Sequence, residues 1–200
     1  MRLAPPARMT YEEFLKADFG EQRVEWVDGE TEYMGTVSAA HARLVGFLVR
    51  LLPFFLEHYR LGELFFEPFN MRLPQRPSGR NPDILFVSTE HREQIRKNHL
   101  DGPADLIIEV ISPDDASRDR VVKRREYEAA GVPEYWILDP ERKEALFLVL
   151  NENGRYEEVA PAEGVYRGKV MAGLCIEVEW LFREPLPPLM DVLRAWGLVP

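Results

Sequence analysis

Hydrophobic and polar positions change their spacing several times along this chain. Residues 38–59 carry apolar side chains on most faces of a helical projection, which predicts one long helix packed against a sheet, with Pro53 as a place where it could kink or split. Residues 104–111 (ADLIIEVI) form a nearly continuous apolar run, typical of a central strand buried on both faces. This combination predicts an α/β fold with a mixed sheet between helices.

Shorter segments complete the expected pattern. Strands are expected at residues 64–73, 83–87, 134–138 and 145–150, with additional edge strands at 155–159 and 175–180. Helices are expected at 9–18, 90–98, 117–130 and 189–196, the first one opening with a Thr10-x-x-Glu13 capping box. Residues 23–34 alternate around Asp28–Gly29 and predict a β-hairpin, whereas the turn formers at 74–81 predict a loop.

Composition and charge narrow the class of protein. Two hundred residues, 46% of them hydrophobic, suit a single domain over residues 1–200, with 1–8 as a flexible N-terminal tail. No run approaches the roughly 18 apolar residues of a membrane span, and the lone Cys175 fits a reducing cytoplasm. The net charge of −9 argues against a protein that coats nucleic acid, but it leaves room for a local basic strip.

Glu109 is the most informative residue, because it is a carboxylate inside the most apolar strand. A lone buried carboxylate costs several kcal/mol unless it is paired or binds a metal, so both a core salt bridge and a metal ligand or catalytic acid remain open. Asp83, which follows Pro82 at the mouth of the preceding apolar strand, favours the second interpretation. Carboxylates at strand ends hold Mg²⁺ well, although a turn-capping aspartate is the alternative.

Lys123 is the candidate positive group for the same site. It lies on the helix that follows the Glu109 strand, one turn after Asp119. Hydrolysis of a phosphodiester needs a positive charge near the attacking water, and a lysine on this helix could supply it. The alternative is an ordinary surface pair between Asp119 and Lys123.

Several segments together resemble the Uma2 (DUF820) family, which is similar to the PD-(D/E)xK restriction-endonuclease superfamily. They are EEFL near the N-terminus, EWVDGE at residues 25–30, the helix opening with His41, NPDILFVS, DLIIEVISP, Asp119-x-x-x-Lys123, Tyr127 and AGVPEYWILDP. The resemblance extends over about residues 9–182. It implies a restriction-endonuclease-like mixed central sheet flanked by helices, with a β-hairpin extension.

The resemblance also implies a role for each matched residue. Asp83 corresponds to the aspartate of the PD half-motif and Glu109 to the acidic residue of (D/E)xK, and together they would hold Mg²⁺ or Mn²⁺. The chain departs from the pattern at Ile111, where the superfamily has a lysine, and Lys123 is expected to take over that role. Glu25 could add a carboxylate or pair with an arginine, and His41 could orient a phosphate or water or cap its helix.

The implied function is metal-dependent hydrolysis of DNA by an endonuclease. Arg118, Arg120 and Arg124, which lie beside Lys123 and Arg125, are the expected DNA contacts, and a solvated face balanced by nearby acids is the alternative. Gln75 and Arg80 in the preceding loop could also touch a substrate backbone. A second hypothesis is a catalytically inactive binding or assembly module, for example a homodimer formed through a sheet edge or the last helix.

Overall fold

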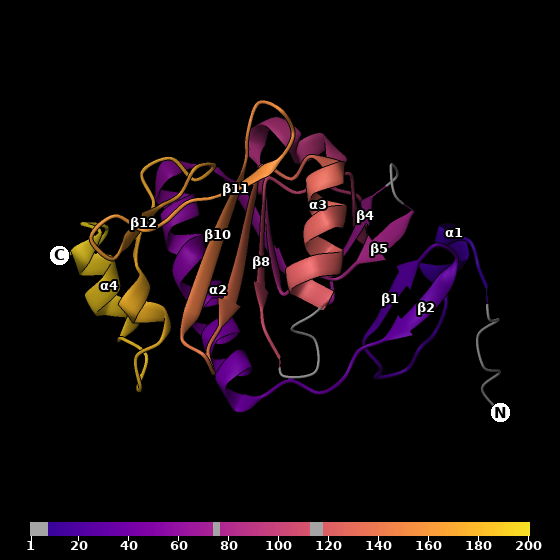
Figure 1. Cartoon of the computed structure of the whole chain (residues 1–200), viewed down its shortest axis with the longest axis horizontal. Helices are drawn as coiled ribbons and strands as arrows, with labels where there is room; N and C mark the ends of the chain where they lie inside the picture. Colours follow the sequence, from indigo (N-terminus) through magenta and orange to yellow (C-terminus); the bar gives the residue numbers. More distant parts are fainter. Residues whose placement is uncertain (1–7, 74–76, 113–117) are drawn as a thin grey trace.

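A mixed six-stranded sheet forms the centre of the protein (Figure 1). The computed structural model describes residues 8–73, 77–112 and 118–200. The strand order is β11-β10-β9-β8-β6-β3. Their bounds are β3 Gly62–Phe66, β6 Ile84–Ser88, β8 Leu106–Val110, β9 Glu134–Asp139, β10 Glu144–Leu150 and β11 Tyr156–Glu158. Strands β8 and β9 run parallel and the other neighbours antiparallel, as expected for a mixed α/β sheet.

Helices cover both faces of this sheet. On one face, α2 (Ala39–Tyr59) packs against the side chains of Ile84 and Ile108. On the other face, α3 (Arg124–Ala130) packs against Leu85 and Ile107. Because alternate residues of β6 and β8 point to opposite faces, both strands must be apolar throughout. The prediction of a central strand buried on both faces is confirmed.

Helix α2 begins as the sequence predicts and continues past Pro53 without a break. The hydroxyl of Ser38 caps it by accepting a hydrogen bond from the backbone N–H of His41, so the His41 side chain does not serve as the cap. Within the described part of the chain, α2 is the one helix whose length and composition would allow it to cross a membrane. In this fold its apolar side instead packs into the core.

A second, five-stranded sheet lies beside the first and contains the expected hairpin. Its order is β2-β1-β5-β4-β7, with bounds β1 Val24–Val27, β2 Glu30–Tyr33, β4 Asn70–Leu73, β5 Ser78–Arg80 and β7 His99–Asp101. The β1–β2 turn uses Asp28 at φ 49° and Gly29 at φ 90°, the left-handed conformation that a two-residue hairpin turn requires. The short helix α1 (Tyr11–Phe14) precedes the hairpin and has the complete capping box.

The structure corrects several predictions about the strands. The single strand expected at 64–73 is two strands, β3 and β4, in different sheets, and Pro68, which cannot donate to a ladder, lies between them. The expected loop at 74–81 contains β5, while 74–76 are outside the described residues. The last expected edge strand is β13 (Cys175–Glu177), which pairs with β12 (Val165–Arg167) in a separate sheet.

Two helical predictions also change. The charged helix at 90–98 is a 3-10 helix, η1 (Thr89–Gln94), and a further 3-10 helix, η3 (Val178–Leu181), follows β13. The helix expected at 117–130 begins as a π-helix, η2 (Arg118–Lys123), and continues as α3, ending at Gly131 as predicted. The last helix is α4 (Leu189–Ala195). Residues 1–7 of the expected tail are outside the described residues, and Arg8 forms an ion pair with Glu30.

Candidate functional site

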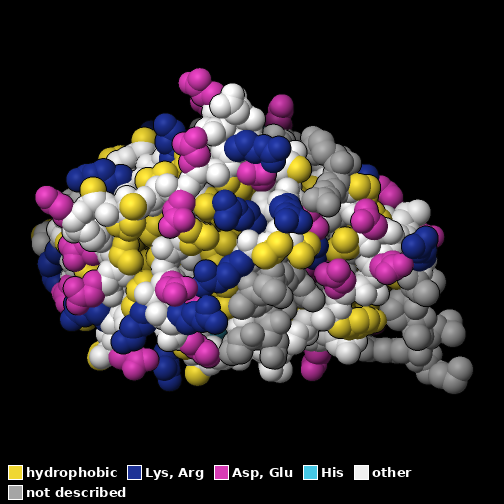
Figure 2. Space-filling model, viewed as in Figure 1, with side chains coloured by type: hydrophobic (Ala, Val, Ile, Leu, Met, Phe, Trp, Pro, Cys, Tyr) yellow, Lys and Arg dark blue, Asp and Glu magenta, His cyan; other side chains and the backbone are white. Residues whose placement is uncertain are grey.

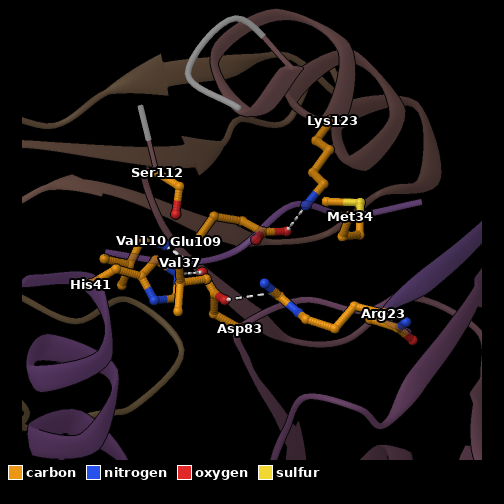
Figure 3. Close-up of a pocket in the computed structure, with 10 residues that line it drawn as sticks. Arg23, Met34, Val37, His41, Asp83, Glu109, Val110, Ser112 and Lys123 are labelled. Carbon is orange, nitrogen blue, oxygen red and sulfur yellow. Dashed lines mark hydrogen bonds and ion pairs between the residues drawn. The ribbon is translucent and has the colours of Figure 1, made fainter. Parts of the chain in front are cut away.

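The register between β6 and β8 brings Asp83 and Glu109 together. Ile84 pairs with Ile108 in an antiparallel ladder, so one step further along the ladder places residue 83 opposite residue 109. The first turn of α2 and the η2 helix reach the same end of the sheet, and Figure 3 shows side chains from all four elements around one cavity. The sequence pattern predicted Asp83 at the mouth of one strand and Glu109 inside another, and the register explains why they meet.

Three elements hold the Asp83 carboxylate. Its Oδ2 atom accepts a hydrogen bond from the backbone N–H of Val110 at 2.7 Å and lies 3.1 Å from Nε2 of His41. Its Oδ1 atom faces the guanidinium of Arg23, at 4.0 Å. The Asp83 carboxylate is therefore oriented by a backbone N–H of the sheet, by His41 of α2 and by Arg23, which precedes the β1–β2 hairpin (Figure 3).

Glu109 is held from the opposite face of the sheet. Its Oε1 atom accepts hydrogen bonds from Nζ of Lys123 and from the hydroxyl of Tyr127, both at 2.9 Å. Lys123 and Tyr127 are four residues apart and so project from the same side of the helical segment. Glu109 is 3% exposed and Lys123 2% exposed. Glu109 therefore forms a buried salt bridge with Lys123, as one interpretation of the sequence expected. It also lines the cavity, as the interpretation as a metal ligand or catalytic acid requires.

A buried ionic network lies behind Lys123. An oxygen of Glu25 is 3.6 Å from Nζ of Lys123, and the same oxygen accepts the N–H of Asn81 at 3.0 Å. Burial alone would raise the pKa of Glu25, but Lys123 and Arg80 hold it below its usual 4.5. Glu25 therefore pairs with an arginine, one of the two roles expected of it, and it contacts Lys123 from behind without lining the cavity.

Arg80 is the centre of that network. Its guanidinium bonds Glu25 at 2.7 Å, Glu32 at 3.0 Å and both oxygens of Glu126 at 2.8 Å. Although burial opposes the charged form, these carboxylates raise its pKa. Arg80 is 1% exposed, so the expectation that it touches a substrate backbone is wrong; it supports the site from within. The companion expectation for Gln75 falls on a residue outside the described ones.

The cavity between the two carboxylates has a volume of about 20 Å³. Roughly 10–15 Å³ is enough for one water molecule, so the cavity accepts a water or a small ion. Two of its lining residues each carry a buried polar atom with no hydrogen-bond partner among the described residues: Nδ1 of His41 and Oγ of Ser112. Such unpaired polar atoms are expected where an occupant supplies the missing partner.

The residues around the cavity fit a divalent cation with hard oxygen ligands. No group of three or more His, Cys, Asp or Glu side chains in the described ranges is arranged to hold a metal. Mg²⁺, however, commonly uses only one or two carboxylates and takes its other ligands from water and substrate phosphate. The site charges also favour a cation. Ion pairs at and behind the cavity link three cations with six carboxylates. The cations are Arg23, Arg80 and Lys123, and the carboxylates are those of Glu25, Glu32, Glu67, Asp83, Glu109 and Glu126.

The structure gives the surroundings of two of the three arginines expected to contact DNA. Arg120 is paired with Asp139 at 3.2 Å and with Glu144 at 2.9 Å. Arg124 is half-buried on α3, and the side chain of Arg118 is outside the described set. Figure 2 shows basic side chains interspersed with acidic and apolar ones over this side of the molecule. Contact between these arginines and DNA stays a prediction.

Sequence reasoning assigned no role to Arg23 or Tyr127, which the structure places at the site. Tyr127 carried one local signal, its i+4 spacing from Lys123. Arg23 had no such signal, because its bidentate partner Glu67 and its neighbour Asp83 are distant in the sequence. Pairing across that separation follows from the fold alone.

Fold and site together define a class: an α/β protein whose mixed sheet presents two buried carboxylates and a helix-borne lysine at one end. The chain matches the sequence profile of the Uma2 family, described as "Putative restriction endonuclease", over residues 11–179. Since that match spans most of the chain, the protein belongs to the Uma2 family. The expected family is confirmed.

The fold is also that of a solved structure. The chain is similar to the crystal structure of "a putative nuclease belonging to DUF820 from Anabaena variabilis ATCC 29413", with a TM-score of 0.73 and 18% sequence identity, over 87% of this chain and 97% of that one. At this identity the likeness shows the fold, and it confirms the predicted fold class. No curated protein matches the sequence.

Proposed function

We propose that this protein is a metal-dependent endonuclease that hydrolyses phosphodiester bonds in DNA. The observation that carries the proposal is the convergence of Asp83, Glu109 and Lys123 on one small cavity. Membership of a family described as restriction endonucleases supports a nucleic-acid substrate. In this proposal Asp83 and Glu109 hold Mg²⁺ or Mn²⁺.

The protein's own groups divide the remaining work. A bound divalent cation would polarise a phosphoryl oxygen and lower the pKa of a water molecule. His41 and the Val110 N–H keep the Asp83 carboxylate facing the cavity, and Tyr127 does the same for Glu109. Lys123 lines the cavity and places a positive charge where negative charge develops on the phosphate, which lowers the barrier.

The departure from the superfamily pattern at Ile111 is compatible with this proposal. Ile111 is buried in the apolar cluster beneath α3, so its side chain belongs to the core. Lys123 reaches the Glu109 carboxylate at 2.9 Å from the neighbouring helical segment instead. A lysine near the acidic pair is thus retained, although it comes from a different element.

Plasmid nicking tests the proposal. The wild type should convert supercoiled plasmid to the open circle with Mg²⁺ or Mn²⁺, and EDTA should stop the reaction. Asp83→Asn, Glu109→Gln and Lys123→Met should each lower the rate at least 100-fold, whereas Lys97→Met, a change at an exposed lysine, should leave it unchanged.

Two results would contradict the proposal. Absence of metal-dependent nicking by the folded wild type would leave the alternative of an inactive binding or assembly module. If Glu109→Gln is folded by circular dichroism and still nicks plasmid, the reaction takes place at another site.

A further inference from the structure

A second concave surface lies along α2, outside the carboxylate site. This groove has a volume of about 810 Å³ and runs between α2 and residues 181–186. Ala40, Gly46 and Val49 from α2 form one side, and Phe182 and Leu186 contribute to the other. A Cβ placed on Gly46 would meet nothing within 4 Å, so the groove is open to solvent there.

Three arginines line this apolar groove. They are Arg43 and Arg50, which are seven residues apart on α2, and Arg183 on the facing segment. All three are exposed, and none forms an ion pair with a carboxylate in the part of the chain that the structure describes; Arg50 donates its Nε–H to the carbonyl of Gly46. Because three guanidinium groups face the single carboxylate of Glu184 in its lining, the groove has a net positive charge that attracts anions.

We propose that this groove binds the backbone of a single nucleic-acid strand. The arginines would contact successive phosphates, and the apolar floor with Phe182 would pack against the bases. Single-strand sites elsewhere combine basic groups with aromatic platforms in this way. The volume falls within the roughly 300–1,000 Å³ of sites for small ligands, so a few nucleotides fit but a duplex does not.

The position of the groove connects it with the carboxylate site, and in this respect the inference rests on the proposed function. Ala40 and Ala42, which line the groove, flank His41, and the side chain of His41 contacts Asp83. A strand in the groove would therefore pass beside the first turn of α2, next to the proposed point of cleavage. This arrangement assigns strand binding to α2 rather than to the arginines around Lys123.

Fluorescence anisotropy with a labelled oligothymidylate in EDTA tests the groove in the intact chain. The variant Arg43→Ala/Arg50→Ala/Arg183→Ala should bind at least tenfold more weakly than the wild type. The slope of log affinity against log salt concentration should fall by about 2, because each phosphate contact contributes about 0.7 for a single strand. The matched control Arg60→Ala/Lys97→Ala/Arg167→Ala removes the same charge at exposed positions elsewhere and should stay within about twofold.

Several outcomes would overturn the inference: no binding by the wild type, equal weakening in both triple variants, or a matching duplex bound as tightly as the single strand. A groove variant that changes the oligomeric state by light scattering and leaves oligothymidylate binding unchanged would assign the groove to a second copy of the chain.

The same assay separates this inference from the proposed function. Glu109→Gln should bind oligothymidylate as the wild type does. Groove-dependent binding by a wild type that never nicks plasmid would overturn the proposed function alone. If the wild type nicks plasmid with metal, but its binding of the single strand does not depend on the groove arginines, this inference alone is overturned.

Discussion

The hydroxyl of Tyr127 and the ammonium of Lys123 donate to the same oxygen of Glu109, and this shared contact fixes how the carboxylate lies. Burial, together with the nearby Glu109 charge, raises the pKa of Tyr127 well above its usual value. Tyr127 therefore stays protonated and remains a hydrogen-bond donor. Residues that orient a metal ligand in this way commonly contribute 10- to 100-fold to metal affinity.

Tyr127→Phe tests this orienting role. We expect Mn²⁺ affinity and the nicking rate to fall about tenfold, because Glu109 loses one of the donors that orient it. The free energy of unfolding should fall by about 1 kcal/mol, the net worth of a buried hydrogen bond. Tyr156→Phe is the matched control, since that buried hydroxyl donates only to the carbonyl of Val132. Loss of metal affinity in both variants, measured by calorimetry, would indicate a general structural effect.

Glu25 makes the stability of the protein depend on pH. Its pKa in the folded state lies below the usual 4.5, so its contribution is present above that value and is lost as the pH falls through the folded pKa. Removing one partner of a buried ion pair costs about 3 kcal/mol or more. In urea unfolding, Glu25→Gln should therefore differ from the wild type by about that amount at neutral pH, and by much less once the pH has fallen below the folded-state pKa of Glu25. A difference that does not change with pH would contradict this assignment.

At the scale of elements, local signals predicted much of the fold. The buried strand β8, the helix α2 and the hairpin turn at Asp28–Gly29 each have a signal within their own residues. The division of residues 64–73 between two sheets has no such local signal, because both halves have similar apolar patterns and their partner strands lie far along the chain. Asp83 and Glu109 were also predicted from their own segments, because each is a carboxylate at or inside an apolar strand.

The supporting contacts of the site were beyond local signals. Arg80 lies in a segment rich in turn formers. It is nevertheless buried, and it forms hydrogen bonds with carboxylates that are 46 to 55 residues away in the sequence. The contact between His41 and Asp83 spans 42 residues. Such contacts depend on the packing of α2 and of the second sheet against the first. A single sequence therefore names the carboxylates more readily than the groups that orient them.

Glu134 lies in β9, does not line the site cavity, and links β9 with the chain around β12. Its buried carboxylate accepts hydrogen bonds from Trp136 Nε1 at 2.7 Å, from the Tyr166 hydroxyl at 2.6 Å, and from the backbone N–H groups of Lys169 and Val170 at 2.9 and 2.8 Å. These bonds hold the chain around β12 against β9.

Glu134→Gln tests this connection. The amide NH₂ of glutamine would face another donor, so we expect the free energy of unfolding to fall by about 3 kcal/mol. Proteolysis within residues 166–174 should become faster, while Mn²⁺ affinity should stay unchanged because Glu134 does not line the site. Glu157→Gln, a change at an exposed strand residue, is the control. Wild-type stability in urea for Glu134→Gln would show that these bonds contribute little.

At the scale of the whole molecule, the sheet and its two covering helices create the site. Helix α2 brings His41 from one face and the η2–α3 segment brings Lys123 and Tyr127 from the other, so both carboxylates are held at one end of the sheet. The chain is acidic overall, with a net charge of −9, and acids outnumber bases around the site. A polyanionic substrate is therefore expected to need a divalent cation at this position.

Calorimetric titration of Mn²⁺ into the wild type and Glu109→Gln tests whether the buried carboxylates hold a metal ion. We expect one binding site per chain in the wild type and affinity at least 100-fold weaker in Glu109→Gln. The control Glu57→Gln, a change at an exposed residue of α2, should bind as the wild type does. A folded wild type without a Mn²⁺ site, or a Glu109→Gln variant that binds Mn²⁺ equally well, would show that Glu109 is not a metal ligand.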